Sequence, residues 1–492
     1  MAIDLRLTAA IAAGKLTAAT SRRLRRGGGM TFPGNVTLAL DGSALGKLGR
    51  SLPSGTVLVT GTNGKTTTTG LITAALQRSG MRVLSNHSGA NIVFGLCAAA
   101  VADAGLDGRA RSSIGIFEVD ELWLERAVRE LQPHLVVVLN FFRDQLDRSG
   151  ELETAAARVG DALQRLPASA QVVFNSDDPQ VVAQCLRSDA QLVPFGIDAE
   201  ELVLARLPHI ADARSCPRCG TNLHFSRIVL AHCGKYTCPG CGFKRLEPRF
   251  SVSRFDASTI NLLRLAMNDG TELEASLGGV YNAYNIAAAY AACRSLGVAE
   301  SDIARGIASF RPKFGRQETL SLHGRAMRFM LAKNPAGFDE VLRTADALGR
   351  TRTYLIAIND GIADGRDVSW LWDVDFERLA TSPQRPLIVA SGRRVEDLAL
   401  RLKYAGMPAE RVISVRDPAA ALRRLAEVLP PGEEGVVIPT YTAMLELRAV
   451  AEREQAVTPF WVAPSIEMTE DVHAADGLTE DERAVSTQRT AG

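Results

Sequence analysis

The feature that most constrains the fold of this chain is an apolar segment that runs through a glycine-containing loop into a threonine-rich segment. Thr56–Thr60 has the composition of a buried strand, and the loop Gly61–Thr66 follows it directly. In a loop that opens a helix, backbone N–H groups cradle phosphates, a lysine adds positive charge and a threonine hydroxyl can bind Mg²⁺. The sequence therefore predicts an α/β domain with a phosphate-binding loop. The candidate nucleotide-binding residues are Gly61, Thr62, Asn63, Gly64, Lys65, Thr66 and Thr67.

Short apolar runs alternate with helix-like segments from about Thr56 to Asp178, which is typical of a parallel sheet covered by helices. A long alanine-rich helix is expected at Asn282–Leu296, where Gly297 stops it. The strands expected in this first region are Thr56–Thr60, Ile114–Glu118, Leu135–Asn140 and Gln171–Asn175.

A second alternating region begins near Thr353 and predicts a separate Rossmann-like domain. Its expected strands are Tyr354–Ile358, Leu387–Ala390, Val412–Val415 and Gly435–Ile438, with a helix at Pro418–Val428. A chain of 492 residues is too long for one compact core, which favours several domains. We expect an N-terminal helical or extended segment at 1–50, a central domain at 51–315, a C-terminal Rossmann-like domain at 316–464 and a disordered acidic tail at 465–492.

Acidic and polar residues follow two of the expected strands in the first region. Glu118 ends one strand, and Asp120 and Glu121 come after it. The segment Asn140–Arg148 follows the next strand. Ligands bind beyond the carboxyl ends of parallel strands, so both groups should face the phosphate loop. Glu118 is the candidate second Mg²⁺ contact beside Thr66, although taken alone these acids would more often form a solvated turn.

Four of the eight cysteines form two Cys-x-x-Cys pairs in a segment of about 214–243 that interrupts the α/β pattern. Two such pairs, separated by residues 220–237, can close on one tetrahedral Zn²⁺ with no open position, which indicates an inserted structural zinc ribbon. The complete set of four leaves His232 and Cys233, and also His224, without a ligand role. The candidate zinc ligands are Cys216, Cys219, Cys238 and Cys241. The cysteines expected to be small buried hydrophobes are Cys97, Cys185 and Cys293.

The net charge and the N-terminal segment indicate which partners and which compartment to expect. The 56 basic and 55 acidic residues give a formal net charge of +1, which removes any global electrostatic reason to expect nucleic-acid binding. The apolar stretch Leu5–Ala19 precedes the basic cluster Arg22–Arg26, the reverse of the order in a secretory signal. We therefore expect a cytoplasmic protein, with a helix that lies on a membrane surface as the less favoured alternative.

Taken together, these motifs resemble those of the Mur ligase family. The matching segments are Gly61–Thr66, Phe117–Glu121, Asn140–Arg148 and Tyr281–Asn285. Further segments narrow the resemblance to the MurT family, whose members are the ligase-like subunits of lipid II isoglutaminyl synthase. These are the predicted zinc ribbon, Leu331–Gly337, Asn359–Asp360 and Asp364–Trp370. Together the matches cover roughly residues 5–465.

The resemblance implies roles for individual residues. Asn285 should hydrogen-bond adenine with Asn282 close by, and Arg316 resembles an arginine that Mur ligases direct at the nucleotide. The candidate catalytic residues are Lys65, Glu118 and Asp367. Asp367 resembles an aspartate that orients the catalytic histidine of a partner subunit. By residue type alone, the neighbouring aspartates that stay open as alternatives are Asp360, Asp364 and Asp373.

The resemblance also implies the reaction and the partner. A GatD-like glutamine amidotransferase subunit in a heterodimer would release ammonia, and ATP with Mg²⁺ would activate the D-glutamate α-carboxylate of lipid II as an acyl phosphate. A substrate of this kind would bring the chain to the inner face of the plasma membrane.

Two alternatives remain. One is a stand-alone Mur or folylpolyglutamate-type ligase, which adds an amino acid; the zinc ribbon and the segment Asp364–Asp367 count against it. The segment Leu331–Asn334 also departs from the corresponding segment of the ligases that add amino acids, which disfavours an ordinary amino-acid substrate. The other is a zinc-ribbon ATPase that binds nucleic acid, which the few aromatic residues of the ribbon and the neutral charge disfavour.

Overall fold

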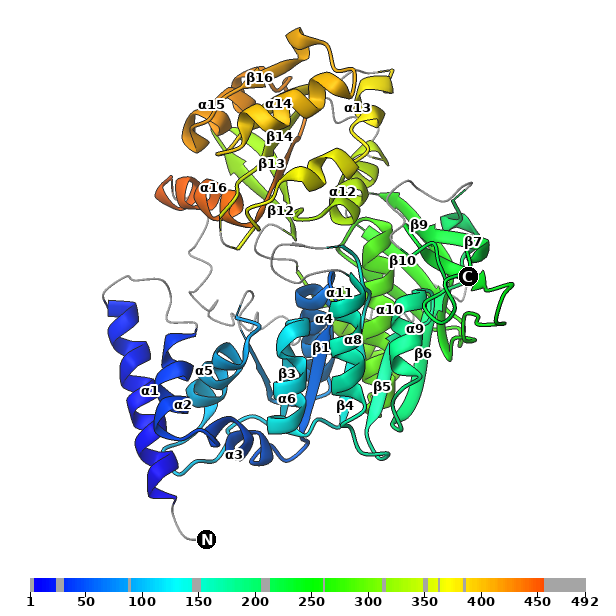
Figure 1. Ribbon diagram of the computed structural model, residues 1–492. Coiled ribbons are helices and arrows are strands. Elements are labelled where there is room, and N and C mark those ends of the chain that lie inside the picture. The colour runs from blue at the N-terminus through cyan, green and yellow to red at the C-terminus, as the bar shows by residue number, and fades with distance from the viewer. Residues whose placement is uncertain are drawn as a thin grey trace, which may run out of the picture. The chain divides into compact units, whose positions relative to one another are not determined.

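The computed structural model describes most of the chain, and the description is restricted to those residues (Figure 1). They are 4–23, 31–86, 90–143, 152–204, 213–259, 262–311, 316–347, 353–361, 363–383 and 386–454. The predicted disordered tail at 465–492 and residues 144–148 of the polar segment lie outside them. The described residues all belong to one contact unit, 1–457, so the predicted boundaries near residues 50 and 315 stay predictions.

A nine-stranded sheet carries the phosphate loop. Its strands are β1 (Thr56–Thr60), β2 (Val83–Ser85), β3 (Ile114–Glu118), β4 (Leu135–Val138), β5 (Gln171–Asn175), β6 (Gln191–Ile197), β9 (Phe250–Thr259), β10 (Leu262–Met267) and β11 (Glu272–Ala275). The order is β11-β10-β9-β6-β5-β4-β1-β3-β2. All neighbours pair in parallel except β9 with β10 and β10 with β11. The predicted parallel sheet is confirmed, and β1 is the third strand from the β2 edge, between β4 and β3.

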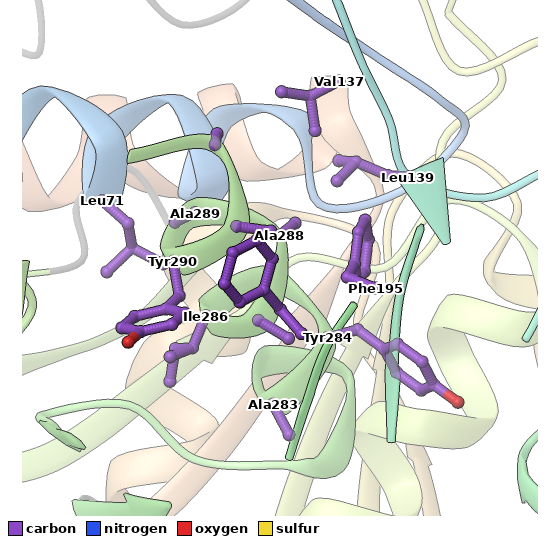
Figure 2. Close-up of a cluster of buried hydrophobic side chains, with 14 of the residues drawn as sticks. Leu71, Val137, Leu139, Phe195, Ala283, Tyr284, Ile286, Ala288, Ala289 and Tyr290 are labelled. Atoms are coloured by element: carbon purple, nitrogen blue, oxygen red, sulfur yellow. The ribbon is translucent and has the colours of Figure 1, made fainter. Parts of the chain in front are cut away.

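Side chains of β1 alternate between two apolar cores because successive residues of a strand point to opposite faces. Val57 and Val59 pack in one core with helices α4 (Lys65–Arg78) and α10 (Val280–Ser295), while Leu58 packs in the other. Figure 2 shows side chains from α4, β4, β6 and α10 meeting in the first core. The alanine-rich composition of α10 suits this position, since small side chains let a helix lie close to a sheet.

The remaining helices of this region lie around the sheet (Figure 1). They are α1 (Leu5–Arg23), α2 (Phe32–Leu40), α3 (Ala44–Arg50), α5 (Val93–Asp103), α6 (Leu124–Leu131), α8 (Leu152–Leu163), α9 (Pro179–Cys185) and α11 (Glu300–Ser309), with short 3₁₀ turns η1 (Glu121–Trp123) and η2 (Glu200–Leu202). Among the described residues, no helix combines the length and apolar character needed to cross a membrane.

The cysteine-containing segment forms a two-stranded antiparallel hairpin, β7 (His224–Leu230) and β8 (Cys233–Thr237), flanked by two tight turns. The N–H of Gly220 donates to the carbonyl of Cys216 at 2.9 Å, and the N–H of Gly242 donates to that of Cys238 at 3.0 Å. Both glycines have a positive φ, +76° and +73°, which residues with a side chain rarely adopt. The two turns therefore have the same backbone form.

A six-stranded sheet forms the C-terminal region. Its strands are β12 (Arg316–Leu322), β13 (Arg325–Met330), β14 (Thr353–Ala357), β15 (Leu387–Ser391), β16 (Val412–Ser414) and β17 (Gly435–Pro439), in the order β12-β13-β17-β14-β15-β16. Its helices are α12 (Pro335–Ala347), α13 (Glu377–Thr381), α14 (Val395–Tyr404), α15 (Pro418–Val428) and α16 (Tyr441–Arg453), with η3 (Ser369–Asp373) and η4 (Ala409–Arg411). From β13 to β16 all neighbours are parallel, which confirms the predicted α/β class.

Predicted element bounds differ from the observed ones by a few residues. The strand predicted at Leu135–Asn140 ends at Val138. The N–H of Leu139 makes the last backbone hydrogen bond to β1, at Thr60. The pairing stops there because the side chain of Asn140 is hydrogen-bonded to the phosphate loop. The helix predicted at Asn282–Leu296 begins two residues earlier, at Val280.

Candidate functional site

The phosphate loop leaves β1 and opens α4 through two glycines in conformations that other residues rarely adopt. Gly61 has φ +127° and Gly64 has φ +90°. A Cβ atom on Gly64 would also lie 2.1 Å from Oδ1 of Asn285. Glycine at position 64 therefore lets Asn285, from α10, lie directly against the loop.

Asn140, which lies two residues beyond the end of β4, supports the phosphate loop through hydrogen bonds. Its Oδ1 accepts from the N–H of Asn63 at 2.9 Å, and its Nδ2 donates to the carbonyl of Asn63 at 3.1 Å. The carbonyl of Asn140 also accepts from the N–H of Thr62 at 2.9 Å. The sequence placed Asn140 near the site but did not reveal this role; the available signal was its position just beyond a strand that pairs with β1.

Lys65 is the first residue of α4, and 8% of its surface is exposed. Its ammonium donates to the carbonyl of Gly61 and to that of Thr62 at 3.3 Å, and it lies 3.4 Å from both carboxylate oxygens of Glu121. Burial acts to raise the pKa of Glu121, but the charge of Lys65 and hydrogen bonding outweigh it and leave that pKa below its usual value. Glu121, absent from our predicted site residues, is thus the ionised partner of Lys65.

Thr66 and Glu118 form the adjacent pair. The Thr66 hydroxyl donates to Oε2 of Glu118 at 2.6 Å, and Glu118 is 5% exposed. Asn86 fixes the end of β3, because its Oδ1 accepts from the N–H of Glu118 at 2.9 Å and its Nδ2 donates to the carbonyl at 3.0 Å. A hydroxyl beside a carboxylate at the phosphate loop is a donor set that suits Mg²⁺. Asn86 was not predicted from the sequence.

A cavity opens beside the loop. It is lined by Asn63, Gly64, Thr67, Asn140, Phe142, Asn175, Leu230, Cys233, Leu277, Tyr281, Asn282, Tyr284, Asn285, Met330, Leu331, Ala336, Gly337, Glu340 and Val341. The Nδ2 of Asn285 donates to Oδ1 of Asn282 at 2.9 Å, so these two predicted residues line it together. Arg316 begins β12, but its side chain lies outside the described part of the chain.

The four predicted zinc ligands come together at the two tight turns. Cys216 Sγ lies 3.7 Å from Cys241 Sγ, and Cys219 Sγ lies 3.4 Å from Cys238 Sγ. All four sulfur atoms lie within 4.8 Å of one another. Four thiolates at about 2.3 Å from a tetrahedral Zn²⁺ would be about 3.8 Å apart, so the cluster has the size such an ion requires.

The other cysteines are all buried. Burial raises the pKa of Cys97 and of Cys293 to about 12, in keeping with the predicted role as small hydrophobes. Cys233 and His232 were set aside as spare in the sequence, but the structure places them with Asp178 in a second buried group of potential metal ligands.

Asp367 lies on an exposed loop that leads into η3. Its carboxylate accepts from the N–H and the hydroxyl of Ser369, at 2.8 and 2.9 Å, and these hydrogen bonds hold the pKa of Asp367 below its usual value. The group is therefore ionised near neutral pH.

The three alternative aspartates have partners elsewhere in the chain. Asp364 is buried and accepts from the N–H of Thr442 at 2.9 Å, in the first turn of α16; burial raises its pKa. Asp360 lies 3.8 Å from Arg394, and Asp373 lies 3.3 Å from Arg143. The arrangement favours Asp367 over Asp364 as a carboxylate that can serve another protein.

Comparisons with known proteins agree with this geometry. Residues 59–215 match the family model of the Mur ligase middle domain, and residues 331–444 match that of the MurT ligase C-terminal region. The chain is similar to the MurT subunit of lipid II isoglutaminyl synthase (glutamine-hydrolysing) of Streptococcus pneumoniae, at 33% identity over 92% of this chain and 99% of that one. The corresponding subunit of Staphylococcus aureus is 32% identical over 89% and 96%.

A solved structure shows the same fold. A pseudomurein peptide ligase type C from Methanothermus fervidus superposes with a TM-score of 0.61 at 22% identity, over 81% of this chain and 78% of that one. Similarity to the Streptococcus subunit along nearly its whole length goes beyond a shared fold, and we conclude that this chain belongs to the MurT family of Mur-ligase-type subunits.

Proposed function

We propose that this chain is the ATP-consuming subunit of an enzyme that converts the D-glutamate α-carboxylate of the lipid II stem peptide into an amide, which gives D-isoglutamine. The relatives named as lipid II isoglutaminyl synthase subunits support this assignment. The observation that carries it is the arrangement of buried Lys65 and Glu118 with half-buried Thr66 at the phosphate loop. A carboxylate is a poor electrophile, so it has to be phosphorylated before ammonia can replace one of its oxygens.

The loop would hold the phosphates of ATP through its N–H groups and the N-terminus of α4, with Lys65 offsetting their charge. Mur ligases use ATP and Mg²⁺. Thr66 and Glu118 would hold the Mg²⁺ ion, which supplies positive charge to the phosphates. Asn282 and Asn285 line a cavity next to the loop, which is a suitable place for adenine. Arg316 is proposed as a further contact of the nucleotide.

The reaction then has two steps. A carboxylate oxygen attacks the γ-phosphorus of ATP, the bond to the β-γ bridging oxygen breaks, and acyl phosphate and ADP form. Ammonia next attacks the acyl carbon, a C–N bond forms, the C–O bond to phosphate breaks, and the nitrogen loses a proton. Lys65 stabilises negative charge as it shifts during the first step.

Ammonia would come from a partner subunit. Relatives are named as subunits of a glutamine-hydrolysing enzyme, which supports a partner of the GatD-like glutamine amidotransferase kind. We assign Asp367 to this interface, where its ionised carboxylate would orient the partner's catalytic histidine and complete a Cys-His-Asp arrangement. A lipid-linked substrate would place the reaction in the cytoplasm, at the inner face of the plasma membrane.

The four-cysteine cluster is proposed to be a structural zinc ribbon. Its four thiolates leave no open position on a tetrahedral ion, so it would contribute to folding and not to chemistry. Replacement of Cys216 or Cys238 with serine should lower zinc content and thermal stability together. Well-folded wild-type protein without zinc would contradict this assignment.

The function is tested with the purified two-subunit complex, lipid II and ATP. Either glutamine or ammonium should yield ADP, phosphate and lipid II with an amide at D-glutamate, as identified by mass spectrometry. Amino acids in place of ammonium should not be incorporated. Incorporation of an amino acid without the partner would instead establish the stand-alone ligase.

A further inference from the structure

A second group of metal-ligating side chains lies outside the four-cysteine cluster; none of its members is a proposed nucleotide contact, although Cys233 also lines the cavity beside the phosphate loop. Asp178, His232 and Cys233 all have 0% of their surface exposed. One ligand atom of each lies within 4.8 Å of those of the other two. Asp178 caps the start of α9, whereas His232 and Cys233 stand at the turn between β7 and β8. Distant parts of the chain therefore bring an oxygen, a nitrogen and a sulfur donor together.

Hydrogen bonding does not account for the burial of the His232 imidazole. Among the described residues, neither of its ring nitrogens has a hydrogen-bond partner, although the side chain is fully buried. Buried polar groups are as a rule hydrogen-bonded, and leaving one unsatisfied costs roughly 1–3 kcal/mol. The ring of Phe142 packs against it with the centroids 4.8 Å apart, which fixes the position of the ring but satisfies neither nitrogen.

The spacing of the donors fits a metal ion better than a hydrogen bond. Nε2 of His232 lies 3.4 Å from Oδ2 of Asp178. A charge-assisted N–H···O bond is usually about 2.7–2.9 Å long. Two ligands at about 2.0–2.1 Å from a tetrahedral Zn²⁺ are separated by about 3.3 Å. The Sγ–Sγ distances of 3.7 and 3.4 Å in the four-cysteine cluster are likewise close to the separation of about 3.8 Å expected around a tetrahedral Zn²⁺.

Asp178 is held as metal-binding carboxylates usually are. Its Oδ1 accepts from the N–H groups of Gln180 and Val181, at 2.9 and 3.3 Å. Its Oδ2 accepts from the N–H of Phe141 at 2.8 Å. Each carboxylate oxygen has two lone pairs, so Oδ2 keeps capacity for a cation, and such hydrogen bonds orient a ligand toward its metal.

We propose that Asp178, His232 and Cys233 form a second site for a divalent cation of the Zn²⁺ type, distinct from the four-cysteine cluster. Imidazole and thiolate donors select zinc over Mg²⁺ or Ca²⁺. Three protein ligands leave a fourth position for water, as in zinc sites that are not closed. Asp178 accepts from the N–H of Phe141, and the preceding residue, Asn140, is hydrogen-bonded to the phosphate loop. The ion would therefore link the β7–β8 turn, through Asp178, to the segment that supports this loop.

Metal content tests the proposal with the full-length chain in complex with its partner, loaded with Zn²⁺ alone and freed of excess metal. The wild type should bind two zinc ions per chain, and Cys219→Ser and His232→Ala should each bind one. Cys293→Ala is the matched control, because Cys293 is an equally buried cysteine that belongs to neither metal-ligand group of the described residues, and it should keep two.

X-ray absorption of the wild type at the zinc edge decides the matter even if His232→Ala fails to fold. A mixture of sulfur with nitrogen and oxygen neighbours supports the second site. One zinc ion with four sulfur neighbours overturns it. One zinc ion with sulfur, nitrogen and oxygen neighbours supports the second site and contradicts the ribbon assignment. None of these results tests the proposed amidation.

Discussion

The two carboxylates assigned to the ligase site and to the partner interface are held in opposite ways. Glu118 is buried, accepts from Thr66 of the phosphate loop, and has its backbone fixed by Asn86. Asp367 is exposed, and its hydrogen-bond donors both belong to Ser369, the first residue of η3.

The difference matches what each group is proposed to do. A carboxylate that binds a cation inside the chain gains from burial and from several fixed partners, because its site is complete within the chain. A carboxylate that serves another protein has to stay ionised and accessible until that protein arrives. A carboxylate has about four lone-pair sites, so the two hydrogen bonds from Ser369 leave Asp367 free to accept a further donor.

The largest effect that would sharpen this comparison is expected for Asp367→Asn. Losing the negative charge that stabilises an imidazolium should lower glutamine hydrolysis by the complex by about 10⁴-fold, as in other histidine-aspartate pairs. Amidation with ammonium supplied should continue. The measurement is a pair of assays, glutamine hydrolysis and ammonium-dependent lipid II amidation.

Asp364→Asn is the matched control, since Asp364 lies in the same segment but is buried against Thr442. It should mainly lower thermal stability, with glutamine hydrolysis largely retained. Normal hydrolysis by Asp367→Asn, together with a steep loss in Asp364→Asn, would reverse the assignment.

Lys65→Ala should reduce ammonium-dependent amidation by roughly 10²–10³-fold, because one preorganised charge is lost from the phosphates. The single variant also leaves the half-buried Glu121 carboxylate without its ion pair to Lys65. The double variant Lys65→Ala with Glu121→Gln removes that charge and should fold as stably as the wild type while staying inactive. Recovery of activity in the double variant would show that Lys65 acts only through folding.

Asn86→Ala tests the support of Glu118. A ligand that loses its orienting partner typically loses about 10- to 100-fold in metal affinity, so the Mg²⁺ concentration for half-maximal amidation should rise by that factor. Asn268→Ala is the control, because Asn268 bridges backbone groups of Ser251 and Arg249 in another part of the sheet. An equal Mg²⁺ shift in both variants would argue for a general loss of stability.

The smallest effect is expected for Ser369→Ala. The lost hydroxyl donor contributes about 1 kcal/mol, which corresponds to about a fivefold fall in glutamine hydrolysis, since the backbone N–H still binds Asp367. Ammonium-dependent amidation should not change. A fall in both activities would place Asp367 at the ligase site and break the division of roles proposed above.

The sequence predicted those parts of the site that depend on local pattern. Lys65 and Thr66 were found because a strand, a glycine loop and a helix occur in a fixed order, and Glu118 because it ends a strand. Predicted and observed bounds agree for β1, β3 and β5, where the apolar run is short and clearly flanked.

The supporting residues could not be predicted because their roles depend on distant backbone. Asn86 and Asn140 are ordinary amide side chains in the sequence. The pairing of β2 with β3 brings Asn86 to Glu118, and the pairing of β1 with β4 brings Asn140 to Asn63. The four cysteines by themselves complete a zinc site, so the sequence gives His232 no ligand role, and its spatial neighbour Asp178 has the position of a helix cap.

The contact between Gly64 and Asn285 has a consequence for how the protein is made. Synthesis proceeds from the N-terminus, so the phosphate loop leaves the ribosome long before α10, which begins at Val280. A nascent chain with the loop but without α10 lacks one wall of the cavity, including both asparagines proposed to hold adenine. Unfinished or truncated chains that lack α10 are therefore expected to consume little ATP, and nucleotide turnover is expected to begin only after more than half of the polypeptide has been made.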